Sequence, residues 1–183
     1  MKKLDYKMFL LKLLLLGLSS AVWAASELKF ESSLSGAQEI TTPPGGVVTG
    51  TTGEIEVEFD KALTQATFRL TARNGTGIIQ AHFHCASAGT NVPIVAFLFG
   101  PVASPGIDVG EGSVQDVMDN SAIRSPETPE DIEACGVPLN NIASLAFAMR
   151  AGKIYANVHS AAFPAGVMRG QLLPKDETEN SSE

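Results

Sequence analysis

The sequence predicts an all-β fold, a Greek-key sandwich or barrel with one short helix and a long insertion. Three observations favour this class. Short segments alternate apolar and polar side chains, turns rich in glycine and proline separate them, and only one segment has convincing helical spacing. A length of 183 residues is that of one domain with an ample core.

The clearest strand is predicted over residues 52–60. Its glutamates and its apolar side chains lie on opposite faces, which is typical of an antiparallel sheet with one solvated side. A hairpin connection over 61–66 leads to a second such strand over 67–73. Leu28–Leu34 also alternates, and we expect it to be an edge-type strand. The apolar face of the clearest strand consists of Ile55, Val57 and Phe59.

The next strands follow at short intervals. We expect a glycine-rich turn over Asn74–Gly77, then a strand over Ile78–His84, and a further buried strand over Ile94–Phe99. The last hairpin is predicted from Ile154–His159 and Val167–Leu172.

The long insertion spans Gly100–Asn140, where the regular alternation stops. Connections of this length are unusual in a compact domain unless they are functional or pinned. Within it, Thr128 and Pro129 have the pattern of a helix N-cap followed by the first helical residue. The convincing helix follows over Asn141–Ala151, where apolar residues recur at helical spacing before Gly152.

The first residues of the chain predict export. Residues 1–24 have the basic start, short apolar run and small cleavage-site residues of a signal peptide, with an uncleaved anchor as the alternative. The apolar run is shorter than the roughly 20 residues that span a bilayer. We therefore expect a domain over 25–173 and a disordered acidic tail over 174–183, in the periplasm or secreted, with no membrane span after cleavage.

The charge balance excludes one class of partner. The formal net charge is −7, and cleavage after Ala24 would make the balance more acidic still. An acidic domain does not favour nucleic acid or anionic membrane surfaces.

The two cysteines, Cys85 and Cys135, are expected to form a disulfide bond, since an oxidising compartment allows it and no odd thiol remains. Closing a loop of about 50 residues would stabilise the fold by on the order of 4 kcal/mol. In the competing interpretation Cys85 is a metal ligand beside His84. Strand alternation opposes that interpretation, because it directs Cys85 away from the histidine face.

The candidate site is a set of three histidines. In a strand His82 and His84 point to the same side, and the third histidine, His159, lies in another strand-like segment. Neutral imidazoles bind copper and zinc, and three imidazoles in an open, exported site favour copper. A fourth ligand could be water, a carboxylate or Gln80, which shares the face.

The alternative is that the histidines are structural and hydrogen-bond to the backbone or to Asn157 and Arg169. On either interpretation Gln80, Asn157 and Arg169 are expected around the histidines. No motif of adequate specificity indicates an enzyme: the chain has no G-x-S-x-G elbow, and its acidic strand is more typical of a solvated face than of a calcium site.

Several motifs together resemble the chordin-type (CHRD) domain family. They are LSGAQE at Leu34–Glu39, the TG and TGE repeats within Thr49–Glu54, AHFH at Ala81–His84, NVPIV at Asn91–Val95 and YANVHSAAFPAGVMRGQL at Tyr155–Leu172.

This resemblance implies an immunoglobulin-like or barrel-like β fold, found in exported bacterial proteins and in the animal chordins, which bind growth factors. It brings no catalytic residues. The chain departs from the family pattern at Val92, where the family often has glycine, in a longer proline turn over Thr41–Gly46, and in the Gly100–Asn140 insertion. A protein partner bound through the insertion is therefore the alternative to a metal ion.

A fainter likeness links the chain to copper/zinc superoxide dismutases, which also have an H-x-H strand and a late arginine near the copper. The matching residue types here are His82, His84, His159 and Arg169. The chain lacks the dense histidines and aspartate of the zinc subsite in those enzymes. The likeness is one of fold-level analogy and implies at most a simple redox reaction.

Overall fold

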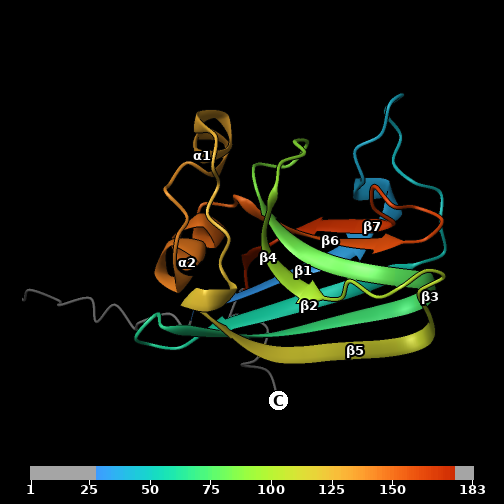
Figure 1. The fold of residues 1–183 in the computed structure, drawn as a ribbon, viewed down its shortest axis with the longest axis horizontal. Helices are drawn as coiled ribbons and strands as arrows, with labels where there is room; N and C mark the ends of the chain where they lie inside the picture. The colour runs from blue at the N-terminus through green and yellow to red at the C-terminus, as the bar shows by residue number, and fades with distance from the viewer. Residues whose placement is uncertain (1–27, 176–183) are drawn as a thin grey trace, which may run out of the picture.

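The computed structural model of the chain describes residues 28–175 (Figure 1). The expected signal peptide and the tail beyond Lys175 lie outside this range. The strands are β1 Lys29–Ser35, β2 Thr52–Phe59, β3 Gln65–Cys85, β4 Ile94–Phe99, β5 Ile107–Asp119, β6 Ile154–Ser160, β7 Met168–Gln171 and β8 Leu173–Pro174. The helices are α1 Pro129–Cys135 and α2 Ile142–Arg150, with short 3-10 turns at Gly36–Gln38 and Asn120–Ala122.

Five of the strands close into a barrel. The order β2-β1-β7-β6-β3 runs around the wall, and β2 pairs with β3 to complete it. Every pairing is antiparallel. The predicted all-β class is therefore confirmed as a barrel. The edge position expected for residues 28–34 is wrong, because β1 lies between β2 and β7.

Strand β3 is the longest element and changes partners along its length. Its first half pairs with β2 and β5, and its second half pairs with β4 and β6. Between the halves Asn74 and Gly77 have φ values of 52° and 61°. The expected turn over Asn74–Gly77 is thus wrong as a chain reversal: the positive φ values bend one continuous strand, which turns a corner of the barrel.

The Gly100–Asn140 insertion contains regular structure that its pattern did not predict. Strand β5 runs beside β3 along the outside of the barrel (Figure 1). Most of its side chains are exposed, so its residues do not alternate between a core and solvent. An apolar-polar period arises only where one face is buried, which is why the strand left no such signal.

The fold class was predicted with one short helix, and within residues 28–175 the structure has two. Helix α1 begins as its sequence predicted, with Thr128 accepting a hydrogen bond from the Asp131 backbone N–H and Pro129 in the first turn. Helix α2 is the predicted helix, and Asn141 and Ser144 form a reciprocal capping box at its start. No helix within residues 28–175 is both long and apolar enough to cross a bilayer.

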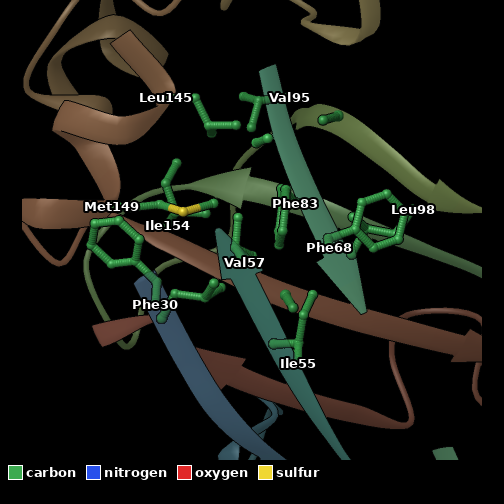
Figure 2. Packing of buried hydrophobic residues seen from close by; sticks show 14 of the residues in the cluster. Phe30, Ile55, Val57, Phe68, Phe83, Val95, Leu98, Leu145, Met149 and Ile154 are labelled. Carbon is green, nitrogen blue, oxygen red and sulfur yellow. The ribbon is translucent and has the colours of Figure 1, made fainter. Parts of the chain in front are cut away.

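The core fills the barrel and the space under α2. Figure 2 shows side chains from β1, β2, β3, β4 and β6 converging with Leu145 and Met149 of the helix. The expected inward residues of the clearest strand, Ile55, Val57 and Phe59, are all buried. The predicted disulfide bond between Cys85 and Cys135 is confirmed, and it joins the end of β3 to the end of α1 with a Cα–Cα distance of 5.0 Å.

Candidate metal centre

The histidines lie on the outer face of the barrel wall. In β3, Ala81 and Phe83 belong to the core cluster, so the residues that alternate with them point outward. Strand β6 pairs with β3 in a register that sets Asn157 opposite His82 and Tyr155 opposite His84. Residues directly opposite in an antiparallel pair project on the same side. Polar and aromatic side chains from two strands therefore form one continuous layer.

This outer layer is buried even though it is not part of the core. His82 is 1% exposed, His159 is 8% exposed, and His84 is partly buried. Loops fold back over the wall and contact it: the backbone oxygen of Val92 meets His84, and that of Pro164 meets His159. Loop residues therefore contact two of the three titratable rings.

The structure brings the three histidines together. One ligand nitrogen from each lies within 4.8 Å of the others. The ring centroids of His82 and His84 are 5.5 Å apart, and those of His82 and His159 are 4.6 Å apart. Neither cysteine takes part, because both are in the disulfide bond.

The hydrogen bonds fix which ring nitrogens carry protons. A carbonyl oxygen only accepts, so His84 Nδ1–H donates to Val92 O over 2.7 Å and His159 Nδ1–H donates to Pro164 O over 3.0 Å. In the neutral ring His159 Nε2 is then an acceptor, and it receives the Nδ1–H of His82 over 3.1 Å. These assignments leave a bare lone pair on Nε2 of both His82 and His84.

Both lone pairs are buried without a protein donor. Within residues 28–175, Nε2 of His82 and Nε2 of His84 have no hydrogen-bond partner. An unsatisfied buried acceptor is costly, on the order of 1–3 kcal/mol each. Each of these lone pairs is available to a cation or to an added proton donor.

The surroundings keep the rings neutral. Burial lowers the pKa of His82 to about 3, and the neighbouring histidines and Arg124 add to the effect. Burial also lowers the pKa of His84 to about 4, against the opposing effect of its hydrogen bond to Val92. The pKa of His159 is likewise lowered by burial. Neutral imidazole is the form that binds metal ions, so the site is in the binding form at neutral pH.

A stack of three side chains supports His84. The Tyr155 ring lies parallel to the His84 ring, with centroids 4.8 Å apart, and the Arg169 guanidinium lies 3.4 Å from the Tyr155 ring centroid. Arg169 also donates to Asn91 Oδ1 and Thr90 O. The stack holds the loop that carries Val92 against the wall.

On the other side of His82, the Phe97 ring packs edge-on at 4.8 Å between centroids, and the Arg124 guanidinium lies 4.5 Å from that ring's centroid. Phe97 and Arg124 line a shallow pocket of about 310 Å³. An aromatic ring therefore separates His82 from this pocket.

Glu39 is a part of the site that the sequence did not predict. Glu39 is 8% exposed, and its carboxylate accepts from Asn157 Nδ2 at 3.0 Å for each oxygen. Burial raises its pKa to about 7, while the hydrogen bond from Asn157 and the charge of Arg169 act in the opposite direction. The alternation of β6 indicates Tyr155, but no periodic signal points to Glu39, which follows a 3-10 turn.

The residues expected around the histidines take different places. Gln80 lies opposite His159 on the same face, and Asn157 lies opposite both His82 and Arg169. The hydrogen bonds of the histidine rings go to backbone oxygens and to each other, and Asn157 and Arg169 are not their partners in the described range.

One family model matches the chain, that of the CHRD domain, over residues 30–172. Neither a curated protein nor a solved structure matches it.

Proposed function

The chain belongs to the CHRD domain family, and from this premise we propose that it is an exported, non-catalytic binding domain that holds a copper or zinc ion. His82, His84 and His159 are the proposed ligands. The matched range, 30–172, contains all three, so the site lies within the family domain itself.

The observation that carries the proposal is the pair of unpartnered Nε2 lone pairs on His82 and His84. Metal-binding histidines commonly donate their other ring N–H to a carbonyl, which fixes the ring and its tautomer. Val92 O does this for His84, and Pro164 O does it for His159. These two contacts orient the rings of His84 and His159 and leave Nε2 as the nitrogen without a proton on each.

Copper is the first choice of metal. Imidazole nitrogens bind Cu²⁺ more tightly than Zn²⁺ at comparable geometry. The disulfide bond is compatible with an oxidising compartment, and a signal peptide over residues 1–24, as the sequence predicts, would direct the domain to the periplasm or outside the cell. Zinc is the alternative where copper is scarce.

Calorimetric titration of residues 25–183 with Cu²⁺ and with Zn²⁺ tests the proposal. We expect one ion per chain with a dissociation constant at or below micromolar, about −8 kcal/mol, and loss of binding in His84→Ala. Glu58→Gln is the matched control, because it removes a charge from the exposed acidic face of β2 and leaves the histidines intact.

Equal binding by His84→Ala and the unmodified chain would assign the heat to surface carboxylates and overturn the proposal. Absence of both heat and thermal stabilisation with either ion would overturn it as well.

A second candidate function is a structural or protein-binding domain of the cell envelope. Its support is the exposure of apolar side chains on the 100–140 insertion, where Ile107 is 43% exposed, Val117 is 53% exposed and Ile132 is 37% exposed. In this case polar substitutions at these three positions would abolish capture of a partner, whereas His84→Ala would only lower stability.

A further inference from the structure

We propose that Oδ1 of Asn157 is the fourth protein ligand of the metal ion, and that Glu39 is the positioning residue that turns the Asn157 amide to present this oxygen. The inference rests on the proposed three-histidine site and completes it with an amide oxygen.

Asn157 lies beside two of the histidines, His82 and His159. It is directly opposite His82 in the pairing of β3 with β6, and it precedes His159 by two residues on the same face. Opposed side chains in such a pair have Cβ atoms about 4.5–5.5 Å apart. Its side chain is therefore a direct neighbour of two proposed ligands, and it is 4% exposed.

The orientation of the amide is set by Glu39. A carboxylate only accepts, so the amide group nearest to it is Nδ2, which lies 3.0 Å from each carboxylate oxygen. The oxygen occupies the other branch of the planar amide. Oδ1 is buried and has no hydrogen-bond partner within residues 28–175.

Four buried side-chain atoms within residues 28–175 have no hydrogen-bond partner, and three of them belong to β3 and β6; the fourth, Gln171 Oε1, lies on β7 opposite Tyr155. Nε2 of His82, Nε2 of His84 and Oδ1 of Asn157 are all electron-pair donors, and all are buried on one face of two neighbouring strands. Unpaired buried groups of mixed kind could satisfy one another after small movements. Three acceptors cannot, and they require a cation or an added proton donor.

The space that Glu39 occupies depends on a glycine at position 166. Gly166 passes so close to the carboxylate that a Cβ there would lie 2.5 Å from Oε1. Gly166 has a φ of 139°, in the region that favours glycine. A side chain at this position would displace Glu39, so the loop leaves room for the carboxylate beside Asn157.

The proposed ligand set favours a divalent ion. Three imidazole nitrogens and one amide oxygen form a set of borderline and hard ligands, which suits Zn²⁺ and Cu²⁺ better than the softer Cu⁺. The Glu39 carboxylate, by accepting the amide N–H, increases the electron density on Oδ1, as outer carboxylates do for other metal ligands. The site is thus one for a divalent ion.

Gln80 and water are the competing fourth ligands. Gln80 lies opposite His159 on the same face and is partly buried. It provides a matched comparison, because a Gln80→Leu substitution removes an amide of the same chemistry from the same layer.

The experiment compares Zn²⁺ affinity in Asn157→Leu and in Gln80→Leu. We expect a loss of 10-fold or more for Asn157→Leu and a change of less than 2-fold for Gln80→Leu. Asn157→Leu alone would leave the buried Glu39 carboxylate without its hydrogen-bond donor. The affinities of Asn157→Leu and Gln80→Leu are therefore also compared in a Glu39→Gln background, where residue 39 carries no charge. Glu39→Gln alone retains an acceptor for the amide and is expected to keep most of the affinity.

A direct readout accompanies the titration. In a ¹³C,¹⁵N-labelled protein, coordination should shift the side-chain Cγ and Nδ2 signals of Asn157 on addition of one equivalent of Zn²⁺ and leave those of Gln80 in place. Equal affinities of the two leucine variants, with an unshifted Asn157 signal, would overturn the inference and leave the three-histidine site standing. Absence of His84-dependent Zn²⁺ binding by the unmodified protein would overturn both.

Discussion

His82 and His159 share a hydrogen bond of 3.1 Å between Nδ1 and Nε2, although 77 residues separate them in the chain. The bond joins β3 to β6 on the outer face of the barrel. It also competes with metal binding, because it occupies the Nε2 lone pair of His159. An ion that uses this nitrogen must displace the His82 N–H first.

Replacing His159 by leucine should destabilise the metal-free protein by about 1–3 kcal/mol, because His82 Nδ1–H is then buried without an acceptor. Replacing both His82 and His159 by leucine should cost less than the sum of the two single changes. Urea unfolding of the four proteins in a double-mutant cycle measures the coupling. A coupling energy below about 0.5 kcal/mol would mean that the bond contributes nothing to the fold.

Acidification should destabilise the metal-free protein through His82 and His84. The folded pKa values, about 3 and about 4, are below the ordinary value of 6.5. The stabilising contribution is therefore complete above pH 6.5 and is lost as the pH falls toward these folded values, since only the unfolded chain takes up the protons. Between pH 7.5 and pH 5 the two rings should cost on the order of 2–4 kcal/mol.

Urea unfolding of the wild type and of His82→Gln/His84→Gln across this range isolates that contribution. The variant has neither titrating ring, so the gap in unfolding free energy between the two proteins should narrow as the pH falls. A constant gap would show that these histidines titrate alike in the folded and unfolded chains.

Glu39 should act in the opposite sense over the same range. Its folded pKa of about 7 is above the ordinary 4.5, so its contribution is present below pH 4.5 and is lost as the pH rises through 7. Relative to the wild type, Glu39→Gln should therefore be more stable at pH 8 than at pH 5, by on the order of 2 kcal/mol. Thermal unfolding at the two pH values checks this, and an equal difference at both would contradict it.

Arg169→Lys should loosen the loop that covers the site. Lysine keeps the charge but loses the planar stacking on Tyr155 and the paired donation to Asn91 and Thr90. We expect a loss of about 1–3 kcal/mol and faster amide exchange at Val92. Hydrogen exchange followed residue by residue measures the second effect, with residues of β2 as the internal reference. Unchanged exchange at Val92 would show that the loop is held by other contacts.

Most of the correct predictions came from the alternation of apolar and polar residues along the strands. It predicted β2 from Ile55, Val57 and Phe59, and it placed His82 and His84 on one face, where the structure also has them. It did not predict β5, because a largely exposed strand needs no alternation. The glycine content of Asn74–Gly77 suggested a turn, but glycine content alone could not distinguish a chain reversal from a bend within one strand.

Glu39 could not be assigned to the site from the alternation of residues. It meets Asn157 across 118 residues of sequence, and its burial depends on a loop folding back over the outer face of the barrel. Neither periodicity nor composition contains that information. The motif LSGAQE resembled a family pattern and included Glu39, but a resemblance names a residue without giving its contacts.

The closure of the barrel constrains the order in which the protein can fold. Strand β1 pairs with the far end of the domain, Ser35 with Arg169 and Phe30 with Pro174. A ribosome must therefore complete nearly the whole domain before the wall can close, and a nascent chain that stops before β7 leaves β1 with one open edge. Such non-local pairing makes folding slow. The same dependence holds for the histidine cluster, because His82 lies in β3 and His159 in β6, and the two come together only when the late strand β6 has paired with β3.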